Sequence, residues 1–221
     1  MPDPTADSPR HTILDSAAHL FARKGFAATG MREIARNAHV NLAMINYYFG
    51  SKIDILRILL DEFFTGFLAE AEIHLTQPAD LNTKLTAYIH GAIRYFSRNI
   101  DRHRVAIIEF PFEIPEIVDL KTNYVRRLIG LFHQNILPPD SSRPAANLDA
   151  FPIAIIGPAL GAMMSSFFLM SPIISKLRPV EITPAFIDWY ADIIATLFLH
   201  GVPELLSRAG MHIPSTPGDP S

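Results

Sequence analysis

The sequence contains no cysteine, which excludes disulfide bridges, thiolate metal sites and cysteine nucleophiles from the chemistry of this chain. The nine histidines form no H-x-x-x-H pair, and neither a glycine-rich phosphate loop nor a G-x-S-x-G segment occurs. Alternating strand patterns and internal repeats are also missing. These absences predict an all-α protein that is not an enzyme and holds no metal and no cofactor.

Three carboxylates, Glu109, Glu113 and Glu116, stand close enough in the sequence to suit acid–base chemistry. The intervening Pro111 and Pro115 exclude regular helix, so the rim of a solvated loop explains these residues as well. An all-α enzyme acting on a hydrophobic substrate therefore stays open as an alternative, which a screen for turnover would decide.

The first eight residues lack an apolar run and carry no basic residue, so they do not form a secretory signal. The absence of cysteine fits a reducing compartment, and we expect a cytoplasmic protein. The chain has 221 residues, of which 49% are hydrophobic, enough for a sizeable core and too many for intrinsic disorder.

The segment Thr29–Lys52, TGMREIARNAHVNLAMINYYFGSK, predicts two short helices joined by a tight turn. Apolar residues recur at helical spacing in each half. They are Met31, Ile34, Ala35 and Ala38 in the first half and Leu42, Ile45 and Phe49 in the second. Asn41 is suited to cap the second helix. The pattern indicates a helix-turn-helix, although an ordinary helical hairpin has the same periodicity.

Several residues at fixed offsets resemble the DNA-binding signature of the TetR family of bacterial transcriptional regulators. They are Phe26-Ala27-Ala28-Thr29, Arg32-Glu33-Ile34-Ala35, Val40-Asn41 and Tyr47-Tyr48-Phe49-Gly50-Ser51-Lys52, within a match from about Ile13 to Leu56. Two positions depart from the family pattern. His39 stands where glycine is usual in the turn, and Gly30 replaces a capping serine or threonine; histidine tolerates left-handed backbone, and glycine costs little at an N-cap.

The resemblance implies two sets of DNA contacts. Base contacts would come from Arg32, Leu42, Ala43, Met44 and Asn46. Phosphate contacts would come from Thr29, Tyr47, Tyr48 and Lys52. Asparagine suits adenine, small apolar groups suit the thymine methyl, and tyrosine and lysine suit phosphates.

The net charge of −3 is unusual for a nucleic-acid binder, but the charge is unevenly distributed. Residues 10–57 hold seven basic and three acidic side chains, a local charge of +4, which leaves −7 for the rest of the chain. A basic head on an acidic body can bind DNA through the head.

We predict four segments along the chain. They are a disordered arm at 1–9, a helix-turn-helix domain at 10–54, an all-helical ligand-binding and dimerisation domain at 55–209, and a disordered tail at 210–221. The first helix is expected at about 10–24 and a long connecting helix at 53–75. Further helices are expected at about 81–98, 102–109, 117–137, 148–170 and 184–208.

Residues 150–175 contain no charged side chain and are long enough to span a bilayer, so a membrane-associated helical protein is a second alternative. Pro152, Pro158 and Pro172 interrupt this stretch and its flanks lack a basic cluster, so we expect no membrane. The resemblance implies instead a homodimer joined by the last two long helices. The residues predicted at that interface are Gly157, Gly161, Met164, Trp189 and Ile193.

Aromatic and methionine side chains are frequent in the body, and for most of them burial in the core is explanation enough. The family body encloses an apolar pocket, so a hydrophobic or aromatic small molecule is the expected effector. The residues predicted to line this pocket are Phe67, Tyr95, Phe96, Phe110, Phe132, Met163 and Phe167. The resemblance thus predicts a homodimeric repressor, released from a pseudopalindromic double-stranded DNA operator by an unidentified ligand; activation rather than repression fits the sequence equally.

Overall fold

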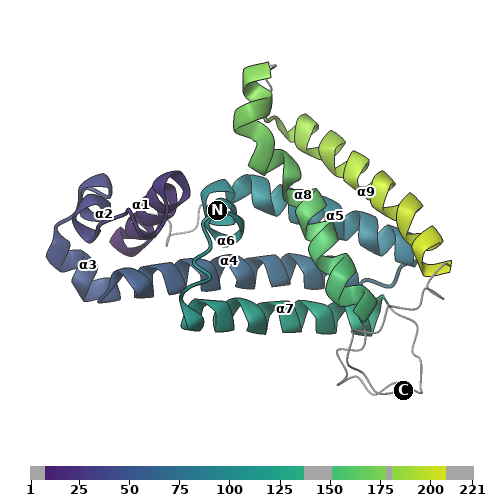
Figure 1. The fold of residues 1–221 in the computed structure, drawn as a ribbon, viewed down its shortest axis with the longest axis horizontal. Coiled ribbons are helices and arrows are strands. Elements are labelled where there is room, and N and C mark those ends of the chain that lie inside the picture. Colours follow the sequence, from purple (N-terminus) through teal and green to yellow (C-terminus); the bar gives the residue numbers. More distant parts are fainter. Residues whose placement is uncertain (1–7, 137–150, 178–180, 208–221) are drawn as a thin grey trace, which may run out of the picture.

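The computed structural model describes residues 8–136, 151–177 and 181–207, and this part of the chain forms nine helices and no strand (Figure 1). The helices are α1 Pro9–Lys24, α2 Met31–Asn37, α3 Leu42–Phe49, α4 Lys52–Leu75, α5 Leu81–Arg98, α6 Ile100–Ile107, α7 Pro115–Asn135, α8 Phe151–Leu177 and α9 Pro184–Ser207. The all-α prediction is confirmed. The tail expected at 210–221 and nearly all of the arm expected at 1–9 lie outside the described residues.

Helices α1, α2 and α3 form a head at one end of the elongated molecule, and α4 to α9 form the body (Figure 1). The head begins at Ser8, whose Oγ accepts a hydrogen bond from the His11 N–H at 3.3 Å, followed by Pro9 at the first helical position. Helix α1 ends at Gly25, where φ is +83°. This boundary agrees with the predicted one.

Helix α4 runs from the head through the body, and α1, α3, α5, α6 and α7 all pack against it. Its buried side chains cover more than one face, as the sequence predicts for a connecting helix. They are Ile55, Leu56, Leu59, Leu60, Phe63, Phe64, Leu68, Ala71 and Leu75. The domain boundary predicted at 54/55 falls in the first turn of this helix.

Helix α8 is the element that differs most from the prediction, because it continues to Leu177 rather than ending near Met170. Pro172 has no N–H to donate to the carbonyl of Phe168, four residues earlier, so a hydrogen bond of the helix is missing there. The Oγ of Ser171 donates to this carbonyl at 3.0 Å and replaces the missing bond. The helix therefore tolerates the proline.

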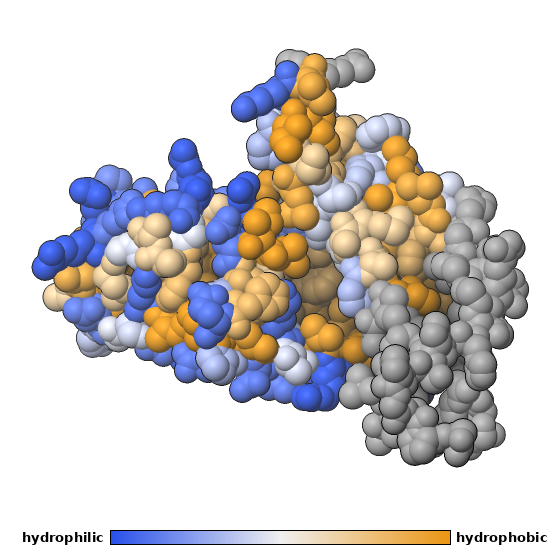
Figure 2. Space-filling model, viewed as in Figure 1, coloured by the Kyte–Doolittle hydropathy of each residue, from blue (hydrophilic) through white to orange (hydrophobic). Residues whose placement is uncertain are grey.

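Within α8, Ile156–Leu177 is long and apolar enough to cross a membrane by length and composition, a criterion that core helices of soluble proteins also meet. The helix packs against α5, α6, α7 and α9 of its own chain, but only 28% of this window is buried. Its remaining apolar surface is continuous with that of α9 in the space-filling view (Figure 2).

Candidate nucleic-acid interface

The turn between α2 and α3 is a Schellman motif that ends α2. The N–H of Val40 donates to the carbonyl of Ala35 at 3.0 Å, and the N–H of His39 donates to that of Arg36 at 3.3 Å. His39 takes the left-handed conformation that this motif requires, with φ of 55°. His39 therefore has the left-handed backbone that a residue replacing glycine in this turn must adopt, as the sequence predicts.

Helix α3 starts at the residue predicted from the sequence. The Asn41 Oδ1 accepts a hydrogen bond from the Met44 N–H at 2.8 Å and so caps the helix. Ile45 and Phe49 are buried against the head, which turns the opposite face of α3 outward. The two helices thus have the arrangement of a helix-turn-helix, in which the second helix is free to enter a groove.

The side chains predicted to contact bases lie on or beside this outer face. Arg32, Ala43 and Asn46 are exposed, whereas Leu42 and Met44 are half-buried. Met44 also packs against the core of the head. The three exposed side chains are therefore accessible to DNA, whereas those of Leu42 and Met44 are only partly accessible.

The two tyrosines predicted to contact phosphates are exposed. Tyr47 is 84% exposed and Tyr48 38%, and their rings meet edge to face with centroids 5.2 Å apart. Their hydroxyls make no hydrogen bond within the described residues, which leaves both free for phosphate oxygens.

Thr29 and Lys52 are placed differently from the predicted phosphate contacts. Thr29 is 2% exposed and its hydroxyl donates to the Gly25 carbonyl at 2.8 Å. The Lys52 ammonium donates to the carbonyls of Phe26 at 2.8 Å and Thr29 at 2.9 Å, and burial lowers the pKa of this lysine. The Thr29 hydroxyl bonds within the α1–α2 loop, and Lys52 holds that loop against the start of α4. We propose these structural roles for the two side chains in place of phosphate binding.

The three acidic side chains of the predicted basic region are each paired. Asp15 meets Arg102 of α6 at 2.7 Å, Glu33 pairs with Lys24, and Asp54 accepts a hydrogen bond from the Ser51 hydroxyl at 2.5 Å. The hydrogen bond from Lys24 lowers the pKa of Glu33, and that from Ser51 lowers the pKa of Asp54. Because these carboxylates are paired, they cancel less of the positive potential that the exposed cations of the head produce.

The body contacts the head through α1 and α6. Besides the Asp15–Arg102 ion pair, the His19 Nδ1 lies 3.1 Å from the Asp101 Oδ2. At the opposite end of α1, Arg10 pairs with Glu62 of α4 at 3.1 Å. A shift of α6 would therefore be transmitted to the head through charged contacts.

The aromatic residues predicted to line one pocket do not gather around a single space. Phe67 and Phe96 pack ring to ring with centroids 5.2 Å apart, and Phe132 meets the ring of Tyr88 at 5.1 Å. Phe110 lies under the ammonium of Lys121 at 4.1 Å. Tyr95, Met163 and Phe167 are likewise packed against neighbouring side chains. None of the seven lines either of two cavities found among the described residues.

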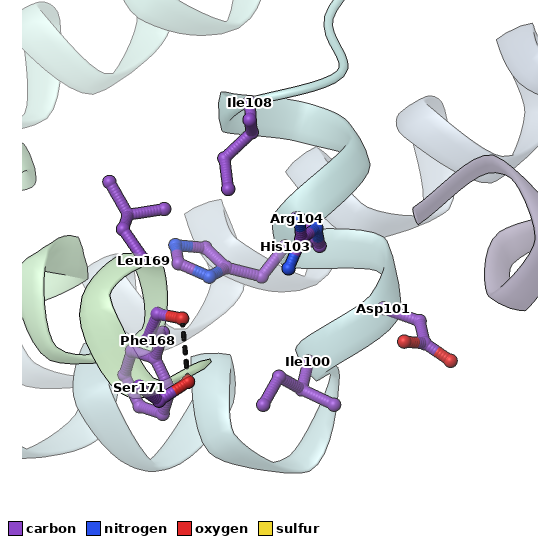
Figure 3. Close-up of a pocket in the computed structure, with 8 residues that line it drawn as sticks. All are labelled: Ile100, Asp101, His103, Arg104, Ile108, Phe168, Leu169 and Ser171. Carbon is purple, nitrogen blue, oxygen red and sulfur yellow. Dashed lines mark hydrogen bonds between the residues drawn. The ribbon is translucent and has the colours of Figure 1, made fainter. Parts of the chain in front are cut away.

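One of these cavities lies between α6 and α8 and has a volume of about 130 Å³ (Figure 3). Its lining consists of Ile100, Asp101, His103, Arg104, Ile108, Phe168, Leu169 and Ser171. None of these residues was predicted from the sequence as a ligand contact. Nothing in their spacing marks them, because the cavity forms only where two helices from distant parts of the chain meet.

No group of three or more side chains that could hold a metal ion occurs in the described residues. Glu113 and Glu116 are exposed to solvent, while Glu109 is half-buried with its carboxylate beside Gly25. The fold and the exposed outer face of α3 together define the class of this chain as an all-α protein with a helix-turn-helix head.

Comparisons with known proteins place this class more narrowly. Residues 13–58 match the family model described as bacterial regulatory proteins, tetR family. The probable HTH-type transcriptional regulator YttP of Bacillus subtilis (strain 168) is 39% identical over 79 residues, which cover 36% of this chain and 37% of that protein. The HTH-type transcriptional repressor NicS of Pseudomonas putida is 34% identical over 87 residues, or 38% of this chain and 41% of NicS.

These alignments span only about two fifths of the relatives' own length. The whole fold has counterparts among solved structures. FadR from Bacillus subtilis, in complex with stearoyl-CoA, superposes with a TM-score of 0.57 at 18% identity, covering 86% of this chain and 97% of that one. Residues 13–58 therefore carry the DNA-binding domain of the TetR family, and the two relatives that share this region are named as transcriptional regulators.

Proposed function

We propose that this chain is a homodimeric, cytoplasmic repressor that binds a pseudopalindromic operator and leaves it when a small ligand binds the body. The observation that carries the proposal is the outer face of α3, where Ala43, Asn46 and Tyr47 are exposed beside a capped helix start. A capped, solvent-facing helix of this kind can enter the major groove, where asparagine hydrogen-bonds adenine.

The homodimer rests on the apolar surface of α8 and α9. Hydrophobic side chains gather along the free end of α8 and over α9 in Figure 2, away from the head. The large exposed ones are Met170, Ile173, Leu177, Trp189, Ile193 and Leu197. A second copy packed on this surface would remove it from water and form a four-helix interface.

The predicted interface residues are not all on this surface. Trp189 is 57% exposed and Ile193 37%, which suits an interface. Gly157 is exposed and Gly161 half-buried, so a partner helix can approach α8 there. Met164 is buried within its own subunit. The sequence did not predict this, because helix α8 is apolar on every side and its periodicity does not show which side faces inward.

Repression and ligand release are supported by the relatives. NicS is named a repressor, and FadR was solved with stearoyl-CoA bound. Ligand and operator would oppose each other because each binds a different spacing of the two heads. Helix α6 is placed to take part, since it touches α1 through Asp101 and Arg102 and lines the cavity that it shares with α8.

Selection of bound fragments from random duplex DNA by the purified protein tests the proposal. The selection is repeated at two salt concentrations, since non-specific phosphate binding weakens steeply with salt. An enriched inverted repeat with half-sites about one helical turn apart, retained at the higher salt, is the expected result. Binding that the higher salt abolishes, with no enriched motif, would contradict sequence-specific recognition by the dimer.

A further inference from the structure

The cavity between α6 and α8 is lined by an arginine, Arg104, whose Nε is buried without a hydrogen-bond partner. The Nε of Arg104 is buried and makes no hydrogen bond, which holds for no other buried side-chain nitrogen or oxygen in the described residues. Arg104 also takes part in none of the ion pairs found there, although its neighbours Asp101 and Arg102 both do. The cavity is the space that this side chain lines (Figure 3).

An unpaired, desolvated guanidinium nitrogen is costly, because it loses its hydrogen bonds to water without gaining others. Arginine presents its donors in a planar fork that matches the two oxygens of a carboxylate. An anionic oxygen acid in the cavity would lie beside this guanidinium, which takes part in no ion pair within the described residues.

The other polar side chains of the lining each make a contact within the protein. The His103 Nε2 lies 3.0 Å from the Oγ of Ser165, and Ser171 donates to the Phe168 carbonyl. The carboxylate of Asp101 is turned away from the cavity toward α1, where it meets His19 at 3.1 Å (Figure 3). Arg104 is the cation of the lining, and its Nε is the buried side-chain nitrogen there that has no partner.

The rest of the lining sets the shape and chemistry of the ligand's body. Ile100, Ile108, Phe168 and Leu169 are apolar and come from both helices. The volume of about 130 Å³ is slightly below that of an apolar cavity of about 150 Å³ known to hold benzene. The space therefore admits one aromatic ring or a chain of about six carbons, with the charged end at Arg104.

We propose that the cavity between α6 and α8 binds a small monocarboxylate with a compact apolar body, its carboxylate paired with Arg104. The inference deepens the proposed function by naming the chemical class of its effector, and it rests on that function only for the effect on DNA. Long acyl thioesters exceed the space, so the ligand class differs from the stearoyl-CoA bound to FadR.

The test measures binding of benzoate and hexanoate to the full-length protein by titration calorimetry at pH 7.5, beside the neutral amides benzamide and hexanamide. Each amide has the shape of its acid but no charge, so this comparison requires no variant. We expect at least one acid to bind between about 10- and 100-fold more tightly than its amide, as for hydrogen bonds to charged groups.

Three variants locate the site. Arg104→Gln removes the charge and should cost the acid a similar factor. Arg126→Gln makes the same change on the exposed face of α7, where this arginine donates only to Asn123, and should leave binding unchanged. Leu169→Phe narrows the cavity while keeping Arg104, and should also weaken binding.

Equal binding of acid and amide, unchanged binding to the Arg104→Gln protein, or no binding by either acid would overturn the inference. Operator affinity is measured in the same samples with and without ligand. An operator that binds tightly while neither acid binds the body refutes the ligand site and leaves DNA recognition standing. Acid binding that depends on Arg104 but leaves operator affinity unchanged supports the site and refutes release by this ligand.

Discussion

The ammonium group of Lys52 lies 4.3 Å from the centre of the Phe26 ring and donates a hydrogen bond to the backbone carbonyl of the same residue at 2.8 Å. Lys52 is the first residue of α4, whereas Phe26 belongs to the loop after α1. One side chain therefore fastens the loop that precedes the helix-turn-helix to the helix that follows it, through a cation–π contact and two short hydrogen bonds.

Lys52→Met should destabilise the head by about 1–3 kcal/mol, because the carbonyls of Phe26 and Thr29 lose a charged donor. The slope of operator affinity against salt concentration should stay the same, since the ammonium is directed at the protein. Urea unfolding and DNA titrations at several salt concentrations measure the two quantities. Arg36→Gln removes an exposed cation of α2 and is the comparison variant. It should leave the unfolding free energy unchanged and reduce the slope of log affinity against log salt concentration by about 0.9. If Lys52→Met reduced the slope and left the stability unchanged, the result would support the phosphate contact predicted for Lys52 from the sequence.

Asn46→Ala should relax the choice of base at one position of each half-site by about 1–3 kcal/mol. The side chain is exposed on α3 and caps no helix, so the unfolding midpoint should not move. Titration of operators that carry each base at each position gives the answer. If every operator variant ranked as it does with the unmodified protein, Asn46 would not be reading a base.

The stability of the protein should fall as the pH is lowered from about 6.5 toward 4, in part through His103. Burial lowers the pKa of this histidine to about 4, from an unfolded value near 6.5, so the unfolded chain binds more protons between these limits. The neutral ring is stacked on Phe96 with centroids 4.2 Å apart and is only 1% exposed. The contribution of His103 is complete above pH 6.5 and is lost as the pH falls through 4, by at most about 3 kcal/mol.

His103→Gln removes the titrating group but keeps a polar side chain for Ser165. Unfolding free energies measured every half pH unit should decline less steeply for this variant than for the unmodified protein below pH 6.5. Parallel declines in the two proteins would show that His103 does not contribute to the acid sensitivity.

Trp189→Asp should convert the proposed dimer to a monomer at micromolar concentration, because a charge would be buried in the apolar surface of α8 and α9. Sedimentation velocity measures the mass in solution. Phe112→Asp is the control, since this residue is 69% exposed on the connection between α6 and α7 and lies outside that surface. A Trp189→Asp protein that sediments as a dimer would place the interface elsewhere.

The head was predictable because its determinants are local. The cap at Asn41, the left-handed turn at His39 and the buried face with Ile45 all follow from spacing within a few residues, and the structure confirms them. The role of Lys52 was not predictable, because its acceptors lie in the loop before α2 and are brought to it only by the packing of the head. Exposed cations and buried ones look alike in a sequence.

The interior of the body was less predictable for a related reason. Aromatic residues that fill a core and those that line a cavity have the same helical spacing, so the sequence did not show that Phe67, Phe96 and Phe132 pack against other rings. The bounds of α8 depended on a hydrogen bond from Ser171 that compensates for Pro172. A count of prolines does not detect this local hydrogen bond between a side chain and the backbone.

The ion pair between Asp15 and Arg102 has a consequence for protein engineering. Residues 9–50 contain the whole helix-turn-helix head and could be fused to the body of another regulator. The cation that neutralises Asp15, however, belongs to α6. A chimaera joined in the first turn of α4 would leave the Asp15 carboxylate without Arg102, and His19 would lose Asp101. A graft intended to keep its affinity should replace Asp15 with asparagine or carry α6 along with the head.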